Sequence, residues 1–159
     1  QAARWFKNTG SKAIDRSGLL VEQNSQRYRH YQKGILVRVD SGTTKDELDF
    51  LHWIQKDLGV TLRISAETLI PGLSNLVVEK WEEFVHHATE FDRVRWLSAE
   101  LAPTNALMEV GIGCDRRSIT QRGDIELSRW LLEQSVSITQ HRYGNTNAGP
   151  KPKCAGLVN

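Results

Sequence analysis

The sequence contains few cysteines and no long apolar run. Its 159 residues include two cysteines, Cys114 and Cys154, too few for a zinc-ligand set or a disulfide framework. We expect two free thiols, as in a reducing intracellular compartment, with a single disulfide that ties down the C-terminal residues as the alternative. No stretch approaches the roughly 20 apolar residues that a membrane-spanning helix needs, so no membrane partner is expected.

Several motifs that identify enzymes and cofactor sites are also missing. The chain has neither a G-x-x-x-x-G-K-[ST] phosphate loop nor a G-x-G-x-x-G dinucleotide fingerprint. Nothing in the sequence brings a serine, a histidine and an aspartate together as a catalytic triad. No cofactor and no metal are therefore predicted. Residues 1–5 show no apolar core of a secretory signal, and the localisation is left open.

The composition is that of an ordinary globular protein, but its charge is unevenly spread. Of the residues, 39% are hydrophobic and 25% charged, with a formal net charge of +2. Residues 1–40 contain eight Lys or Arg and three Asp or Glu, residues 41–100 contain six and eleven, and residues 101–159 contain seven and five. A basic beginning and an acidic middle indicate two differently charged surfaces for partners.

Three regions are distinguished by their composition. Residues 1–17 show no clear period and are interpreted as an irregular arm. Residues 18–142 are expected to form a single α/β domain, a size that fits one hydrophobic core. Residues 143–159 are rich in Gly, Pro and Asn and are interpreted as a tail.

The first half of the domain shows a hairpin pattern and a helix start. Two alternating runs, 27–31 and 35–40, flank Lys33-Gly34 and predict a β-hairpin. Thr44-Lys45-Asp46-Glu47 has capping-box spacing and predicts a helix that ends at Gly59. The alternation from Val60 to Ser65 predicts a strand.

The second half is predicted to add helices and two further strands. We expect one long amphipathic helix, or two, over 73–100, a strand over 106–113, a helix from Asp124 to about Gln134 and a strand over 135–139. The predicted class is α/β (or α+β), with a single mixed sheet, an N-terminal hairpin, and helices packed mainly on one face. Because the strands alternate, the other face should be polar and accessible.

The predicted hairpin would carry a basic face. A two-residue turn at Lys33-Gly34 places Arg29 opposite Arg38, and facing like charges are relieved by a bound polyanion. Tyr31 among these arginines suits base stacking. The alternative is a solvated face on which Asp40 neutralises Arg27. The residues predicted to contact nucleic acid are Arg27, Arg29, Tyr31, Arg38, Arg63, Arg116, Arg117 and Arg122.

Three of those arginines belong to the segment 115–123. This segment also holds two hydroxyl residues and ends in a glycine just before a predicted helix. Helix N-termini favour anions, so such a loop can hold a phosphate. A plain surface loop is the alternative.

Asp40-Ser41-Gly42-Thr43-Thr44 follows an apolar strand and is similar to the catalytic turn of pepsin-like aspartic proteases. The resemblance covers these five residues only, and no second catalytic half is present. A strand-to-helix turn with Thr44 as the helix cap explains the same five residues.

Glu83 and His86 have the Glu-x-x-His spacing of metal sites in helical bundles. At about 100° per residue they fall on the polar side of their helix, opposite Trp81 and Phe84, and no second such pair occurs. We interpret them as part of an acidic, solvated helix face.

The sequence favours a binding or assembly module over an enzyme. We expect it to contact nucleic acid, or another polyanion, through the basic sheet face and the Arg-rich loop. The alternative is a protein-interaction or self-assembling subunit, a homo-oligomer included, that uses the acidic helix face. A small enzyme whose site the sequence does not locate comes third.

Overall fold

The computed structural model describes residues 2–17, 19, 22–73, 75–120, 122–139, 141–142 and 145–146. It contains both helices and strands, which confirms the predicted α/β class. By its internal contacts the chain divides into two compact units. The first combines Gln1–Arg29 with Leu127–Asn159, and the second is His30–Glu126.

The second unit is built on a five-stranded parallel sheet. Its strands are β3 (Ile35–Arg38), β4 (Leu62–Ala66), β5 (Leu76–Val78), β6 (Arg93–Trp96) and β7 (Cys114–Asp115). They lie in the order β5-β4-β3-β6-β7, so the chain first adds strands on one side of β3 and then on the other. This order is that of a doubly wound sheet, in which ligands typically bind where the direction of winding reverses.

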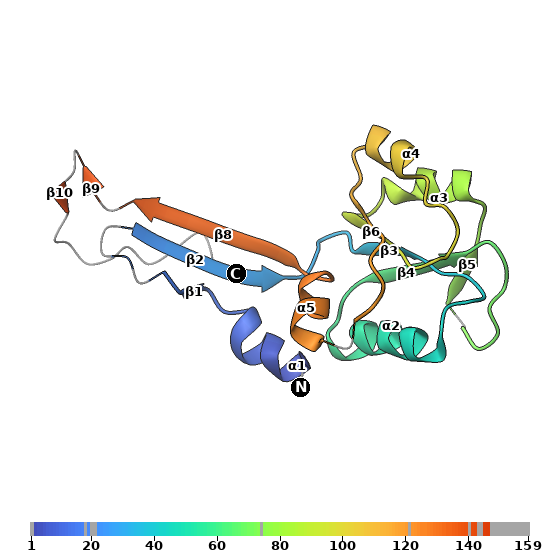
Figure 1. The fold of residues 1–159 in the computed structure, drawn as a ribbon, viewed down its shortest axis with the longest axis horizontal. Coiled ribbons are helices and arrows are strands. Elements are labelled where there is room, and N and C mark those ends of the chain that lie inside the picture. The colour runs from blue at the N-terminus through green and yellow to red at the C-terminus, as the bar shows by residue number, and fades with distance from the viewer. Residues whose placement is uncertain are drawn as a thin grey trace. The chain divides into compact units, whose positions relative to one another are not determined.

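Helices cover both faces of this sheet (Figure 1). Helix α2 (Lys45–Asp57) lies on one face, and α3 (Trp81–Ala88) and α4 (Thr104–Glu109) lie on the other. The expectation that helices pack mainly on one face is therefore wrong. Parallel strands need crossover connections, and right-handed crossovers on either side of β3 place helices on opposite faces.

The central strand shows why the sheet is parallel. Ile35, Leu36 and Val37 are fully buried, which is typical of a strand covered on both faces. On the α3 side, Leu36 packs in one cluster with Phe84, Val94 and Leu107. This cluster holds the sheet and the helices of that face together.

Helix α2 begins and ends as the sequence predicts. Thr44 Oγ1 accepts a hydrogen bond from Glu47 N, and the Glu47 carboxylate accepts one from Thr44 N, which completes the capping box. Leu51 and Ile54 are buried on its inner side. Gly59 follows with φ of +69°, a left-handed conformation that favours glycine after a helix.

The first unit contains a three-stranded antiparallel sheet. Its strands are β1 (Ile14–Asp15), β2 (Glu22–Arg29) and β8 (Leu132–Thr139), in the order β1-β2-β8. The short helices α1 (Ala2–Trp5) and η1 (Phe6–Gly10) precede it, and Trp5 contacts the ring of Tyr28. Strands β9 (His141–Arg142) and β10 (Asn145–Thr146) pair with each other, and α5 (Gly123–Ser128) lies across the boundary between the units in sequence.

The predicted hairpin over 27–40 is wrong. Strand β2 pairs with β1 and β8, whereas β3 pairs with β4 and β6 in another sheet, so the strands predicted to share a single mixed sheet lie in separate sheets. Gly34 is not a hairpin turn residue. It has φ of +94°, and a Cβ there would lie 2.5 Å from the carbonyl oxygen of Thr61, so glycine permits the close approach through which β3 enters the parallel sheet.

Two further element predictions are also corrected. The segment 73–100 contains β5, α3 and β6 instead of a long helix, and residues 104–109 form α4 instead of a strand. The predicted boundaries at residues 17 and 142 stay predictions. Most of the predicted tail, residues 143–159 with Cys154, lies outside the described residues. In the part of the chain that the structure describes, no helix is long and apolar enough to cross a membrane.

Candidate functional site

The structure does not gather the predicted nucleic-acid contacts on one sheet face. Arg29 lies opposite Leu132, not opposite Arg38, because β2 and β3 belong to different sheets. Arg27 donates from Nε to Gln134 of β8 at 2.8 Å. The hydroxyl oxygen of Tyr31 accepts a hydrogen bond from Arg93 at 3.2 Å. The basic face inferred from the hairpin is therefore wrong, whereas nucleic-acid binding itself stays a prediction.

Arg38 is fully buried and faces the interior. Its guanidinium carbon lies 5.7 Å from the ring centre of Phe84 and 5.8 Å from that of Trp96, within cation–π range. Its Nη1 donates to Ser65 Oγ at 3.0 Å and to the carbonyl oxygen of Glu79 at 2.8 Å. A side chain held in this way contributes to the core and cannot contact a phosphate on the surface.

Arg63 also points into the fold, toward the acidic residues near α3. Its guanidinium lies 3.8 Å from carboxylate oxygens of both Glu79 and Glu90, and Glu79 also accepts a hydrogen bond from His87. Glu79 is buried, so it does not belong to the exposed acidic face of α3. Glu83 is exposed and caps the helix by accepting from Lys80 N at 3.1 Å.

A buried ion network involves β6, β7 and the Arg-rich loop. The carboxylate of Asp115 lies 3.1 Å from Arg93 and 2.9 Å from Arg95. It also accepts hydrogen bonds from the backbone N of Arg117 at 3.0 Å and from the Arg117 side chain at 2.9 and 2.6 Å. Arg95 also donates to Glu126 at 3.0 Å. Burial opposes ionisation of Asp115, but the hydrogen bonds from Arg117 and the charges of Arg95 and Arg117 outweigh it and hold the pKa of this carboxyl far below its usual range.

The three loop arginines therefore differ in their surroundings. Arg117 is committed to Asp115, and Arg122 is exposed at the start of α5. Arg116 is exposed, and within the described residues it makes no hydrogen bond or ion pair. It immediately follows β7 and reaches the carboxyl edge of the sheet, where it lines two neighbouring hollows.

The first hollow, which we call the polar crevice, has a volume of about 300 Å³. It lies at the carboxyl ends of β3 and β6, where the direction of winding reverses. Its lining residues are Asp40, Gly42, Thr43, Glu47, Trp96, Leu97, Ser98, Ala99, Arg116 and Ser118.

Asp40 organises the polar crevice. Its Oδ1 accepts from Gly42 N at 2.8 Å, and its Oδ2 accepts from Ser98 Oγ at 2.9 Å and from Ala99 N at 2.6 Å. Burial opposes ionisation, but these hydrogen bonds outweigh it and lower the pKa of Asp40. The predicted strand-to-helix turn is confirmed, and its aspartate is an ionised brace between the ends of β3 and β6.

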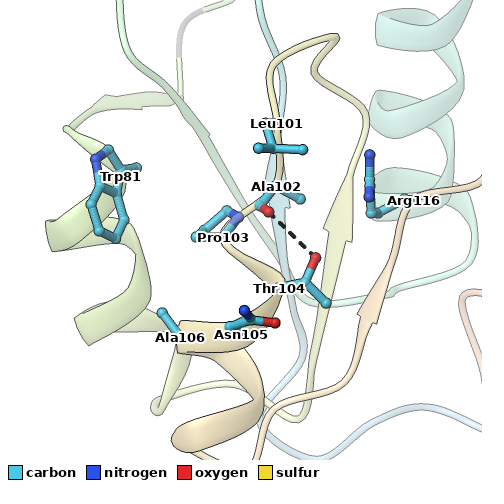
Figure 2. Close-up of a pocket in the computed structure, with 8 residues that line it drawn as sticks. All are labelled: Trp81, Leu101, Ala102, Pro103, Thr104, Asn105, Ala106 and Arg116. Carbon is cyan, nitrogen blue, oxygen red and sulfur yellow. Dashed lines mark hydrogen bonds between the residues drawn. The ribbon is translucent and has the colours of Figure 1, made fainter.

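The second hollow, which we call the apolar groove, has a volume of about 450 Å³ (Figure 2). It is lined by Trp81, Leu101, Ala102, Pro103, Thr104, Asn105, Ala106 and Arg116. Figure 2 shows Trp81 at one side, Arg116 at the other, and the segment 101–106 between them. Trp81 is 49% exposed and Leu101 is 85% exposed, so two large apolar side chains face solvent here.

The apolar groove was not predicted from the sequence. The helical pattern places Trp81 on the apolar side, opposite Glu83 and His86, and so predicts that it is buried. In the structure Trp81 is the first residue of α3, and no earlier turn of this helix covers its side chain. Leu101 lies just beyond the predicted helix, which covers 73–100, and in the structure it belongs to the segment between β6 and α4, outside any helix or strand.

Two further candidate sites are weak in the structure. The described residues contain no group of three or more His, Cys, Asp or Glu side chains that could hold a metal ion. Cys114 is a free thiol and half-buried, and burial raises its pKa. It is therefore a poor nucleophile at neutral pH.

Comparisons with known proteins show the fold and nothing about activity. No protein-family model matches the chain, and no curated protein matches its sequence. Among solved structures, Proline Utilization A (PutA) from Corynebacterium freiburgense has a similar fold, with a TM-score of 0.50 and 23% identity over 89% of this chain. The matched region is 13% of that protein's length, so the chain is similar to a small part of a much longer protein.

Proposed function

We propose that residues 30–126 form a binding module that docks an extended segment of a partner protein in the apolar groove. An apolar side chain of the segment packs on Trp81, Leu101 and Pro103, and a neighbouring carboxylate pairs with Arg116. The observation that supports this most directly is one hollow that combines two exposed apolar side chains with Arg116, a cation that has no hydrogen-bond or ion-pair partner among the described residues.

The energetics favour an occupant for this groove. Large apolar side chains gain roughly 25 cal/mol for each Å² removed from water, and aromatic residues are enriched in protein interfaces. Among the described residues Arg116 has no partner to give up, so pairing with a carboxylate costs it only part of its hydration. A hollow of this size engages a short segment, so we expect a Kd on the order of 10 µM.

The surroundings favour a peptide over a nucleic acid. Glu82, Glu83 and Glu100 are exposed and directly follow or precede the groove residues Trp81 and Leu101 in sequence. A phosphate backbone carries one charge per nucleotide and would be repelled by these carboxylates. A single carboxylate placed on Arg116 avoids most of that repulsion.

The test is a selection for peptides on the intact chain. A phage-displayed library of random twelve-residue peptides is panned on the wild-type chain and, in parallel, on the Arg116→Glu variant. We expect wild-type selections to enrich an acidic residue beside a bulky apolar residue, and the variant to lose the acidic preference. The Lys80→Glu variant, which also reverses an exposed cation near α3, is the matched control and should keep it.

A single-stranded oligonucleotide tested in the same way separates the two classes of partner. Salt-dependent binding of a twelve-nucleotide RNA without peptide enrichment would overturn the peptide proposal in favour of the nucleic-acid prediction. Enrichment of peptides that is unchanged by Arg116→Glu would also overturn it.

A further inference from the structure

The polar crevice carries charges of both signs, and the proposed docking uses none of its lining except Arg116. Asp40 and Glu47 supply carboxylates, and Arg116 is the one cationic side chain among the described residues of the lining. The crevice lies at the point of a doubly wound sheet where small ligands typically bind. Its volume of about 300 Å³ is at the small end of ligand sites.

The chemistry of the lining restricts the ligand. A phosphate is disfavoured because Asp40 and Glu47 line the hollow and Asp46 lies beside them in the first turn of α2. A bare metal ion is disfavoured because both oxygens of Asp40 already accept hydrogen bonds from N–H or O–H donors. An organic ligand with one positive and one negative group matches what remains.

We propose that the polar crevice binds a small zwitterion of the amino-acid type. Its ammonium group hydrogen-bonds to the carboxylate of Glu47 and is attracted at longer range by the charge of Asp40, whose oxygens already accept other hydrogen bonds, and its carboxylate pairs with Arg116. The hydroxyl groups of Thr43 and Ser118 lie in the same lining. Hydrogen bonds hold Asp40 ionised, so its negative charge is in place before a ligand arrives.

Arg116 connects this site to the apolar groove, because it lines both hollows. One guanidinium cannot form a close ion pair with both carboxylates at the same time. If the docking proposed above is correct, on which this consequence rests, a bound zwitterion weakens docking and a docked segment weakens zwitterion binding by the same factor. Such competition would let the concentration of a small molecule regulate the interaction.

The test uses ligand-observed NMR on the intact chain with the twenty common amino acids as probes. We expect at least one to bind, and we expect its amide, which lacks the carboxylate, and its N-acetyl derivative, which lacks the ammonium, to bind more weakly. Absence of binding by all twenty up to about 10 mM, which is weaker than typical specific binding, would overturn the proposal. The proposal would also be overturned if the amide and the N-acetyl derivative bound as tightly as the amino acid itself.

Three variants distinguish the crevice from the groove. Glu47→Gln should weaken amino-acid binding roughly fivefold and leave peptide binding unchanged. Glutamine can still complete the capping box of α2, so this variant should keep the helix. Leu101→Ser should weaken peptide binding and leave amino-acid binding unchanged. Arg116→Gln should weaken both.

The outcomes keep the two proposals apart. Amino-acid binding that responds to Glu47→Gln and Arg116→Gln, without any peptide binding, supports the crevice and overturns the docking. Peptide binding without amino-acid binding overturns the crevice alone. Binding of both without mutual competition refutes a shared role for Arg116.

Discussion

Two kinds of charged residue lie at the carboxyl edge of the parallel sheet, and they differ in whether other residues of the chain pair with them. Asp40 and Asp115 are fully engaged by donors from neighbouring strands and loops. Arg116 directly follows Asp115 and, among the described residues, has no such partner. Trp81 and Leu101 likewise leave apolar surface in contact with solvent. The engaged carboxylates therefore hold the shape of this edge, whereas Arg116, Trp81 and Leu101 have side-chain surface left for a ligand among the described residues.

The largest loss of stability is expected on replacing Asp115. Replacing Asp115 by Ala leaves Arg93 and Arg95 without the carboxylate that they share, and Arg95 is fully buried. Breaking a buried ion pair from one side is strongly destabilising, so we expect the free energy of unfolding to fall by about 4 kcal/mol. Urea unfolding of the intact chain measures this. A loss below about 1 kcal/mol, the range of an exposed pair, would mean that the network does not stabilise the fold.

The pH dependence of stability checks the same carboxylate. Folding lowers the pKa of Asp115 and of Asp40, so the unfolded chain binds protons more readily than the folded chain in acid. Their stabilising contribution is complete above the unfolded pKa of about 3.9 and is lost as the pH falls below it. We expect urea midpoints to drop between about pH 5 and pH 2, and to drop less steeply in Asp115→Asn. An identical slope in the variant would contradict the assignment.

A smaller effect is expected at Asp40. Asp40→Ala removes three hydrogen bonds to a charged acceptor and should lower the free energy of unfolding by about 2 kcal/mol, because water replaces part of them at this half-exposed position. Glu67→Ala, which changes an exposed acid after β4, is the matched control and should stay within about 0.5 kcal/mol of the wild type. Equal losses in the two variants would show that Asp40 is not a brace.

The smallest effect on stability is expected in the groove. Leu101 is 85% exposed, so Leu101→Ser should change the free energy of unfolding by no more than about 0.5 kcal/mol. The same variant should weaken peptide binding severalfold. A large loss of stability would place Leu101 among the residues that hold the fold and remove the basis for a free groove.

Local signals in the sequence predicted part of this edge. The capping box at Thr44 and the stop at Gly59 depend on neighbouring residues only, so α2 and the turn at Asp40 could be predicted. The strand after Gly59 could be predicted too, from its alternation.

Contacts between residues far apart in the sequence could not be predicted from such local signals. Whether Gly34 turns a hairpin or admits a strand beside Thr61 depends on residues far along the chain. The burial of Arg38 depends on Phe84 and Trp96, and its identity as a charged residue argued for the surface. The groove depends on Trp81 and the segment 101–106 coming together, and no local pattern records that.

The most direct test of the account is a charge swap between Arg116 and the peptide carboxylate. A selected peptide and its Asp→Lys or Glu→Lys form are titrated by calorimetry into the wild-type chain and into Arg116→Glu. We expect each single reversal to weaken binding about tenfold and the double reversal to restore most of the affinity, because only paired opposite charges attract. If the double reversal binds no better than the single ones, Arg116 does not recognise the carboxylate and the central claim is wrong.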